Sequence, residues 1–555
     1  MSKKYVIVGG VAGGATAAAR LRRLDESAEV ILLEKGPNVS FANCGLPYYI
    51  GGVITSREEL LVMSPDKFRG LFAVDVRVDS EVVHIDTQAK VLTIRNAGQE
   101  YEESYDSLLL SPGAQPLRPP IPGIENENIV SLRNVPDADR LFSLAQQHGK
   151  AGRAVVVGGG FIGVEVAENL RARGLTVTIV EAALHILAPF DTDMIGPVEA
   201  ELRQNGITLV LQNGVKEFQH QADGTVTVEL GDGQRLPADF VVLAIGVRPD
   251  TAFLQDSGIL LTDRGHIVVD KFMRTNAPDV YAVGDAVMTI DHQTGNKMAL
   301  PLAGPANRQG RLAADNIAGL QREYHGVQGS SILKVFSLIA AATGKNERTL
   351  QKEGLVYGKD YRFTITYPAS HAGYYPGATN FALKMIFRLS DGRVLGAQAV
   401  GQDGVDKRID VLAAIIRQQG TIEDLMDLEL SYAPPFSSAK DPVNMAGYVA
   451  DNILQGLADP IRPEELQAMT EKNMLKIDVR PPIMYERGHL PGFINIPAPK
   501  LRNQLGTLDK DCPIIISCQV GMNGYFMERM LKQHGFNARN LMGGFTYAAP
   551  VLGRA

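Results

Sequence analysis

The sequence predicts an α/β protein of several domains, built mainly on parallel sheets. Three observations lead to this fold class. The chain has 555 residues, beyond the roughly 250–300 at which a single core stops growing, so three or more domains are expected. Two short apolar strands each run into a glycine-rich turn and then a helical pattern. A third strand–loop–helix pattern begins near residue 475, after a polar, proline-containing linker.

Composition narrows the class of protein. Hydrophobic residues make up 45% and charged residues 21%, which is typical of a globular protein, and the net charge of −7 argues against general nucleic-acid binding. No apolar run approaches the roughly 20 residues of a membrane helix, so no membrane association is expected. Only Cys44, Cys512 and Cys518 occur, too few for a disulfide framework. This cysteine usage fits a cytoplasmic location.

The first nucleotide-binding pattern opens the chain. Residues 5–8 form an apolar strand, residues 9–14 read Gly-Gly-Val-Ala-Gly-Gly, and a second strand at 30–33 ends in an acid. Glycines let the backbone approach a pyrophosphate, a helix N-terminus stabilises its charge, and the acid can accept ribose hydroxyls. Val11 replaces the middle glycine of the usual motif, which is therefore imperfect. The candidate binding residues are Gly9, Gly13, Gly14, Glu34 and Lys35.

A second pattern of the same kind is complete. Residues 154–157 form a strand, 158–163 read Gly-Gly-Gly-Phe-Ile-Gly, and the strand at 177–180 ends in Glu181. One such glycine motif can be a chance turn, but two copies, each followed by helix, strand and acid, argue against chance. Glu181 precedes two alanines, which offer no cation for a 2′-phosphate, so we expect NADH rather than NADPH. The candidate residues are Gly158, Gly160, Gly163, Glu181 and Gly246.

Further strand ends fit a protein with two dinucleotide sites. Strands at 108–110 and 241–245 both end near glycine, where the chain would cross between domains, and the strand before Gly284 ends at Asp285. With these motifs the chain resembles the flavin-dependent pyridine nucleotide-disulfide oxidoreductases. The resemblance implies two Rossmann-like domains, with FAD at the first site and NADH at the second. It also implies that Asp285 binds the flavin ribitol; a helix-capping aspartate is the alternative.

Cys44, in the run Ser40-Phe41-Ala42-Asn43-Cys44-Gly45-Leu46-Pro47-Tyr48, is the candidate redox residue of the flavin site. Two-thiol members of the family have a second cysteine five residues later, where this chain has Tyr49. A single thiol cannot close an internal disulfide, so a substrate must supply the second sulfur or oxygen. A free cysteine is often only a small buried hydrophobe. The polar turn argues against that reading, because such a setting favours a low thiol pKa.

The Cys44 run resembles most the coenzyme A-disulfide reductase branch of the family. That branch implies a mixed disulfide with coenzyme A, whose phosphates need cations. Thr16, Arg20 and Arg23 share one face of the first helix, although a solvated arginine face is the alternative reading. A further cation of this branch, near Phe72, is not evident. The residues implied for coenzyme A are Thr16, Arg20, Arg23, Ser40, Asn43, Asn307 and Arg308.

Two other functions stay open. NADH oxidases and peroxidases also use a single cysteine, as a sulfenic acid, but usually carry a histidine at the position of Ala12. Alanine cannot act as a general acid or base, which disfavours peroxide chemistry. The second alternative is a redox-sensing sulfur carrier with low turnover.

Strand patterns at 330–336, 381–387 and 394–400 resemble the family's C-terminal dimerisation domain. The resemblance implies a homodimer in which tyrosines of one subunit cover the cysteine of the other, so that the active sites are shared. Tyr374, Tyr375 and Tyr432 are the candidates. A phenol can donate a proton to a leaving coenzyme A thiolate. Aromatic packing at the interface is the alternative role.

The C-terminal pattern centres on Cys518. An apolar strand at 514–517 delivers this thiol into a six-residue loop, 518–523, before a helix, and Leu541-Met542-Gly543-Gly544-Phe545 closes the unit. The unit resembles a rhodanese domain. Loop amides and the helix dipole can stabilise a thiolate or persulfide. Asn523 stands where rhodaneses often have arginine, which implies weaker use of anionic donors such as thiosulfate. A phosphatase of this fold would have a longer loop, and Cys512 is expected to be structural.

Together these motifs resemble fusions of a coenzyme A-disulfide reductase with a rhodanese. They imply an NADH-dependent flavoprotein that reduces sulfur–sulfur bonds of coenzyme A disulfide, coenzyme A persulfide or polysulfide, while the rhodanese carries sulfane sulfur. No metal is expected. The predicted domains are FAD-binding at 1–112 and 247–325, NAD-binding at 113–246, dimerisation at 329–446, a linker at 447–464 and rhodanese at 465–555.

Overall fold

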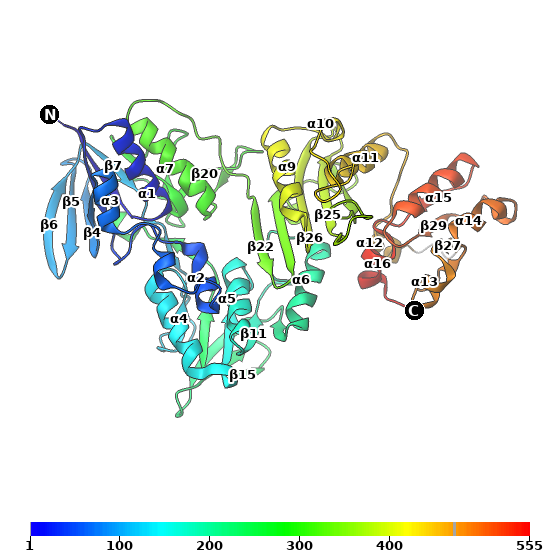
Figure 1. The fold of residues 1–555 in the computed structure, drawn as a ribbon, viewed down its shortest axis with the longest axis horizontal. Coiled ribbons are helices and arrows are strands. Elements are labelled where there is room, and N and C mark those ends of the chain that lie inside the picture. The colour runs from blue at the N-terminus through cyan, green and yellow to red at the C-terminus, as the bar shows by residue number, and fades with distance from the viewer. Residues whose placement is uncertain (1, 470–472) are drawn as a thin grey trace. The chain divides into compact units, whose positions relative to one another are not determined.

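The computed structural model describes residues 2–469 and 473–555 (Figure 1). Contacts divide the chain into two compact units. The first comprises Met1–Ala188 and Glu199–Gln328, and the second comprises Pro189–Val198 and Gly329–Ala555. The predicted α/β class, with two Rossmann-like sheets, an α+β domain and a C-terminal parallel α/β domain, is confirmed.

The first unit begins with a five-stranded parallel sheet in the order β19-β7-β1-β2-β3. Its strands are almost wholly apolar, as expected for a sheet covered on both faces. Helices α1 and α7 pack so closely that a Cβ at Gly310 would lie 2.2 Å from the carbonyl oxygen of Gly13. The elements of this domain are β1 Lys4–Val8, α1 Ala12–Leu24, β2 Glu29–Leu33, α2 Leu46–Gly51, α3 Pro65–Phe72, β3 Asp75–Arg77, β4 Ser80–Asp86, β5 Val91–Asn96, β6 Gln99–Ser104, β7 Ser107–Leu110, β18 Ile267–Val268, β19 Val280–Ala282, β20 Val287–Ile290, β21 Lys297–Met298 and α7 Ala303–Ile317.

The second sheet of this unit repeats the architecture, in the order β12-β11-β10-β16-β9. The antiparallel ribbon of β8 and β17 lies where the chain crosses between the two sheets, as the paired strand ends predicted. The elements are β8 Ala114–Pro116, β9 Ile129–Ser131, α4 Val135–His148, β10 Arg153–Val157, α5 Phe161–Ala172, β11 Thr176–Val180, α6 Thr192–Gln204, β12 Ile207–Val210, β13 Val215–His220, β14 Val226–Leu230, β15 Arg235–Ala238, β16 Phe240–Leu243 and β17 Val247–Pro249.

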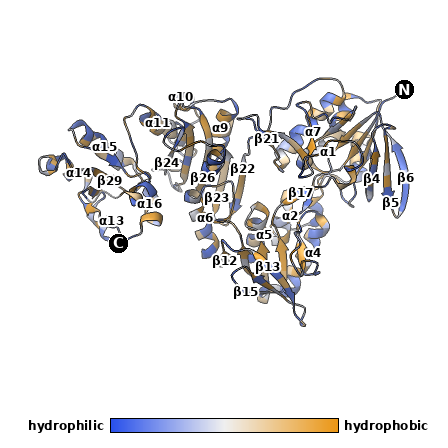
Figure 2. Ribbon diagram, turned by 180° about the vertical axis from the view of Figure 1, so that it is seen from behind, coloured by the Kyte–Doolittle hydropathy of each residue, from blue (hydrophilic) through white to orange (hydrophobic). Residues whose placement is uncertain are grey.

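The second unit contains an antiparallel sheet, β22-β23-β26-β25-β24, and a parallel sheet, β28-β27-β29-β30. Figure 2 shows the strands mainly in the hydrophobic colour, whereas helix α15 is largely hydrophilic. The elements are β22 Ser331–Val335, β23 Leu338–Gly344, α8 Glu347–Lys352, β24 Tyr361–Thr366, β25 Ala382–Arg388, β26 Val394–Gly401, α9 Val405–Arg417, α10 Ile422–Asp427, α11 Pro442–Leu454, α12 Pro463–Ala468, β27 Leu475–Asp478, α13 Pro482–Glu486, β28 Ile494–Asn495, α14 Ala498–Leu501, β29 Ile514–Ser517, α15 Met522–Gln533, β30 Ala538–Asn540 and α16 Gly544–Leu552.

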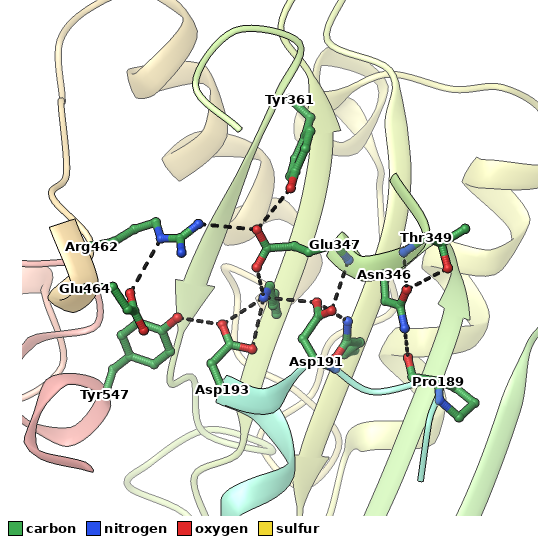
Figure 3. A network of polar contacts seen from close by, with 12 residues as sticks. Pro189, Asp191, Asp193, Asn346, Glu347, Thr349, Tyr361, Arg462, Glu464 and Tyr547 are labelled. Carbon is green, nitrogen blue, oxygen red and sulfur yellow. Dashed lines mark hydrogen bonds and ion pairs between the residues drawn. The ribbon is translucent and has the colours of Figure 1, made fainter. Parts of the chain in front are cut away.

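A buried ion cluster joins three segments within the second unit (Figure 3). The fully buried ammonium of Lys384 lies 3.0 Å from Asp191 and 2.7 Å from both Asp193 and Glu347. From the C-terminal domain, Tyr547 donates a hydrogen bond to Asp193 at 2.5 Å, and Arg462 lies 3.4 Å from Glu347. The cluster thereby connects the start of α6, the antiparallel sheet and helix α16.

Within the described ranges, no helix is both long and apolar enough to cross a membrane.

Candidate active sites

The first glycine loop has the backbone that close approach of a ligand requires. Gly9 adopts φ +95°, and a Cβ there would lie 2.0 Å from the carbonyl oxygen of Ser111. A Cβ on Gly14 would lie 1.8 Å from the carbonyl oxygen of Gly9, so strand and helix can meet only with glycine here. Gly13 lies against α7. Val11, the departure from the glycine motif, precedes α1 as its N-cap without disturbing this geometry.

A cavity of about 430 Å³ lies beside this loop, a size typical of ligand pockets. The carboxylate of Glu34 accepts hydrogen bonds from the backbone N–H of Gly10 at 2.7 Å and of Gly36 at 2.9 Å, and burial raises its pKa. Among the described residues, Asn38 and Asn43 line the cavity with buried amide oxygens that have no hydrogen-bond partner. These groups fit a ligand rich in hydroxyl groups, as FAD is. The Lys35 side chain is exposed and pairs with Asp250.

Asp285 lies where β19 meets a short 3₁₀ turn, Gly284–Ala286. Its carboxylate is 3.5 Å from the guanidinium of Arg133, and burial raises its pKa although Arg133 opposes that effect. The backbone N–H of Gly284 donates to Gln309 at 2.8 Å, which fixes the turn. The sequence did not predict Arg133 at this site, because Arg133 follows β9 and lies far from Asp285 along the chain.

The second glycine loop repeats the arrangement of the first. Gly158 adopts φ +107°, and a Cβ on Gly163 would lie 2.0 Å from the carbonyl oxygen of Gly158. Glu181 accepts the backbone N–H of Gly159 at 2.7 Å, as Glu34 accepts that of Gly10. Gly160 begins α5 and Gly246, at φ +111°, follows β16, and neither has an atom within 4 Å of an added Cβ. This open backbone fits a second dinucleotide.

Cys44 belongs to a 3₁₀ turn, Asn43–Gly45, directly before α2, and its thiol is exposed. The expectation of a lowered thiol pKa is wrong. Partial burial of the sulfur, followed by the carboxylates of Glu165 and Asp285, raises the pKa of Cys44. The residues of the turn itself, Asn43–Gly45, include no cation that would oppose those two acids.

Two residues near Cys44, Tyr48 and Glu165, were not predicted as site residues from the sequence. The phenol of Tyr48 in α2 donates a hydrogen bond to Glu165 in α5 at 3.2 Å. Burial raises the pKa of Glu165 to about 7, and the nearby Glu168 adds to the increase. The signal in the sequence was an acid inside the apolar run 161–166, with which the helix after the second glycine motif begins.

The residues implied for coenzyme A are partly brought together. Thr16 donates a hydrogen bond to the amide oxygen of Asn307 at 2.6 Å, so α1 and α7 contribute to one polar surface. Arg20 is paired with the buried Asp315 at 2.7 Å, whereas Arg23 is exposed and lies 5.9 Å from the ring of Phe72. Ser40 and Asn43 flank Cys44 on the same loop, and Arg308 is exposed next to Asn307.

The predicted tyrosines lie in the second unit and are exposed. The hydroxyl groups of Tyr374 and Tyr432 are 2.9 Å apart, and this hydrogen bond raises the pKa of Tyr374. Tyr375 does not join them; its ring packs edge-on against His371 at 5.7 Å.

Cys518 lies at the end of β29 and is only 2% exposed. The backbone N–H of Gly521, which adopts φ +95° as the N-cap of α15, donates to its Sγ at 3.1 Å. Phe545 donates its backbone N–H to the carbonyl of Cys518 at 2.7 Å, so the Gly543-Gly544 turn holds the loop. We predicted that several backbone amides of the loop would surround this sulfur; among the described residues, only that of Gly521 donates a hydrogen bond to it. Cys512 is half-buried and lies outside this loop.

The loop has a cation that the sequence did not reveal. Arg480 is buried, donates to Gln519 at 3.2 Å and lies 4.1 Å from the ring of Phe545. Asp478 accepts three hydrogen bonds from its guanidinium, which neutralises much of its charge. Asn523, by contrast, is exposed at the start of α15.

Three family models match the chain. Residues 3–310 match the pyridine nucleotide-disulphide oxidoreductase model, residues 330–442 match the dimerisation domain of the same family, and residues 462–548 match the rhodanese-like domain.

Three relatives illustrate the similarity. The coenzyme A disulfide reductase of Staphylococcus haemolyticus is 36% identical over 454 residues, which cover 81% of this chain and 100% of that protein. The structure of reduced CoADR-RHD from Bacillus anthracis is 46% identical with a TM-score of 0.95, covering 100% of this chain and 98% of that one. A NAD-dependent persulfide reductase from A. fulgidus is 36% identical with a TM-score of 0.91, covering 98% and 99%.

The chain is therefore a flavin- and NADH-dependent oxidoreductase with a sulfurtransferase-type domain attached. It belongs to the pyridine nucleotide-disulphide oxidoreductase family. The family resemblance inferred from the glycine motifs, the Cys44 run and the Cys518 loop is confirmed.

Proposed function

We propose that this chain is an NADH-dependent reductase of sulfur–sulfur bonds that uses coenzyme A as the partner of a single redox thiol, Cys44. The observation that carries the proposal is an exposed, unpaired thiol directly after Asn43, which lines the first dinucleotide cavity, and within the electrostatic influence of Glu165 and Asp285. Tyr49, five residues on, has no sulfur to close an internal disulfide. The names of the relatives, a coenzyme A disulfide reductase and a persulfide reductase, support the same substrate class.

The proposed reaction begins with the thiolate of Cys44. It attacks coenzyme A disulfide, forms a Cys44–coenzyme A disulfide and expels one coenzyme A thiolate. With coenzyme A persulfide the leaving group is hydrosulfide. FAD, which the first glycine loop and Asp285 would hold, would accept a hydride from NADH and pass the electrons to the Cys44–coenzyme A disulfide. Two electrons cleave the mixed disulfide and regenerate both thiolates.

The remaining groups have supporting roles in this proposal. Glu34 binds the ribose of FAD and Glu181 that of NADH, and the surface of Thr16, Arg23 and Asn307 binds coenzyme A. The chain acts as a homodimer, in which Tyr374 and Tyr432 from the second subunit donate a proton to the leaving thiolate. Unpaired cysteines suit a reducing compartment such as the cytoplasm.

The rhodanese domain carries sulfane sulfur in the same proposal. The thiolate of Cys518 attacks the outer sulfur of a polysulfide or persulfide, a Cys518 persulfide forms, and the donor leaves as a thiolate. The Gly521 amide stabilises the negative charge on the sulfur. A second thiol then takes the outer sulfur from Cys518.

The test combines mass spectrometry with a matched pair of variants. The isolated protein is expected to carry coenzyme A covalently on Cys44. Cys44→Ser should lose that adduct and reduce NADH consumption with coenzyme A disulfide by roughly three orders of magnitude, because the nucleophile is gone. Cys518→Ser serves as the control and should retain both.

An absent adduct, together with no binding of coenzyme A, would exclude the proposal. Faster NADH consumption with peroxide than with coenzyme A persulfide would favour the oxidase or peroxidase alternative. Negligible NADH consumption with any sulfur substrate would favour the sulfur carrier.

A further inference from the structure

Reduction of a disulfide by a hydride releases a proton that the chain must accept. A hydride is two electrons and one proton, so cleaving one sulfur–sulfur bond with it yields two thiolates and one proton. Neither Cys44 nor the glycine loops offer an obvious acceptor, and Ala12 cannot serve. A side chain near Cys44 that can take up a proton at neutral pH would accept it.

Glu165 and Tyr48 lie in the right place. Tyr48 is four residues after Cys44, on the first turn of α2, and Glu165 is two residues after Gly163 in α5. The phenol of Tyr48 donates to Oε1 of Glu165 at 3.2 Å. Cys44, Tyr48 and Glu165 interact electrostatically with one another. The carboxylate therefore contacts Tyr48, acts electrostatically on the redox thiol and lies on the helix that follows the second dinucleotide loop.

Several charged groups around Glu165 are bound to other partners. On α5, Glu168 is a second acid, and Arg171 donates to the carbonyls of Asn205 at 2.9 Å and Leu175 at 3.1 Å. Arg173, which follows α5, donates to the carbonyl of Ile50 at 2.7 Å. Asp285 acts on Cys44 and is paired with Arg133. Nearby, Tyr49 and Arg57 contact Asp139, and Arg153 of β10 pairs with Asp239.

We propose that Glu165 and Tyr48 form a proton relay for Cys44, in which the Glu165 carboxylate takes up the proton released when the sulfur–sulfur bond at Cys44 is reduced. The proton later returns through the Tyr48 hydroxyl to the coenzyme A sulfur that is freed when the mixed disulfide at Cys44 is reduced. The tyrosines of the second subunit act on the other thiolate, the one expelled when Cys44 attacks its substrate. Glu165 acts through Tyr48 and is a positioning and proton-holding residue. The inference rests on the proposed function, because it assumes that bond cleavage takes place at Cys44.

The titration behaviour of the three groups suits this role. Burial raises the pKa of Glu165 to about 7, although the Tyr48 hydrogen bond lowers it, so both protonation states are populated near neutral pH. Burial and then Glu165 raise the pKa of Tyr48, which keeps the phenol as a donor. The ionised carboxylate in turn raises the pKa of Cys44, so protonation of Glu165 favours the thiolate.

The test measures how fast iodoacetamide alkylates Cys44 in the reduced, FAD-containing protein between pH 5 and 10, followed by mass spectrometry of the Cys44 peptide. The reagent reacts with the thiolate. The wild-type rate should rise in a broad, two-step manner, because the two groups titrate together. Glu165→Gln should give a single step at lower pH, with alkylation about two- to tenfold faster at pH 7.5, since one pKa unit is a factor of ten.

Two further variants make the result specific. Tyr48→Phe removes the hydrogen bond that lowers the pKa of Glu165, so the first step should move to higher pH. Glu168→Gln is the comparison, one helical turn away on α5. Because Glu168 raises the pKa of Glu165, its removal should move the first step to lower pH but keep the two-step form of the profile. The pH profile of NADH-driven disulfide reduction should lose its step near pH 7 in Glu165→Gln only.

A Glu165→Gln protein with the wild-type alkylation profile would overturn the relay. If that variant does not retain FAD, Tyr48→Phe decides instead: an unchanged first step in its alkylation profile would overturn the relay. The alkylation measurement uses no sulfur substrate. It therefore reports on the relay even if coenzyme A proves not to be the partner of Cys44, so failure of the relay and failure of the proposed function are distinguishable.

Discussion

At the scale of single residues, the charge around the Cys518 loop bears on which sulfur donors the proposed sulfurtransferase site would accept. Arg480, which contacts Gln519 of this loop, donates its hydrogen bonds to Asp478, Gln519 and the carbonyl of Gly488. From Cys512 to Met527 the chain has no charged side chain. An anionic donor such as thiosulfate would thus meet mainly backbone N–H groups, of which that of Gly521 donates to Sγ, and under the proposed function we expect slow transfer from it.

Replacing Asn523 with arginine should therefore increase sulfur transfer from thiosulfate. The expected gain is about tenfold in kcat/KM, because a hydrogen bond to a charged group contributes roughly 1.5 kcal/mol or more. Transfer from a neutral organic persulfide should change little. Asn523→Gln is the control, which lengthens the side chain without adding charge. Equal thiosulfate rates in the arginine and glutamine variants would show that charge at this position does not limit the reaction.

The sequence predicted the thiols and the glycine loops but not what surrounds them. Cys44 and Cys518 stand in contiguous motifs, and such motifs are visible in a single sequence. Arg133, Glu165 and Arg480 reach their sites only because distant elements pack together. Of the three, only Glu165 carries a local signal, as an acid in the apolar start of its helix. The raised pKa of Cys44 was missed for the same reason, since Glu165 is 121 positions further along the chain.

At the scale of elements, the contact between α1 and α7 depends on two glycines facing each other. In this contact the backbone of Gly310 approaches the carbonyl of Gly13 too closely for any side chain. The helix pair carries Thr16 and Asn307 on its surface, and Gly13 belongs to the first glycine loop. Distortion of this contact would thus reach both the FAD site and the proposed coenzyme A surface.

Gly310→Ala should lower the melting temperature and the FAD content, because the added methyl group would lie 2.2 Å from a backbone oxygen. Overpacking of this kind typically costs about 1–3 kcal/mol. Gly304→Ala, in the same helix, has no atom within 4 Å of the new methyl group, and alanine's better helix propensity should make it neutral or slightly stabilising. Thermal melting and flavin absorbance measure both. Equal melting temperatures would contradict the argument.

Strand–loop–helix order was predictable at this scale because each βαβ unit is continuous in sequence. The sheet orders follow from the same local rule, since parallel strands need a crossover. Segments that interrupt one unit in sequence and pack in the other were harder to predict. The segment Pro189–Val198 lies between strands of the second sheet in sequence but belongs to the second unit, and only its contacts reveal this. The exact domain bounds stay a prediction.

At the scale of the whole molecule, the Lys384 cluster decides how the C-terminal domain is held within its unit. Burial alone would lower the pKa of Lys384, but Asp193, Asp191 and Glu347 outweigh it and raise the pKa. The ammonium therefore stays charged at any working pH. It compensates three carboxylates that would otherwise repel one another in a buried space.

Lys384→Met should destabilise the second unit strongly, by about 3–5 kcal/mol, because it leaves three acids without their buried cation. Tyr547→Phe removes one hydroxyl and leaves Asp193 paired with Lys384, so its cost should be roughly 1 kcal/mol. Urea denaturation of the full chain measures both. Hydrogen exchange should show faster opening of α16 and β24 in Lys384→Met. Similar costs for the two variants would mean that the cluster does not act through its charge.

Tyr547 stands two residues after Phe545, whose amide holds the carbonyl of Cys518, so the sulfurtransferase thiol is tied to the antiparallel sheet through only a few bonds. These bonds hold the domain against its unit, unlike the mobile arm of a multienzyme complex. If Cys518 carries sulfur as proposed, we expect that sulfur to leave on a small diffusible thiol. The rate of such traffic would depend on the concentration of that shuttle and not on motions of the polypeptide.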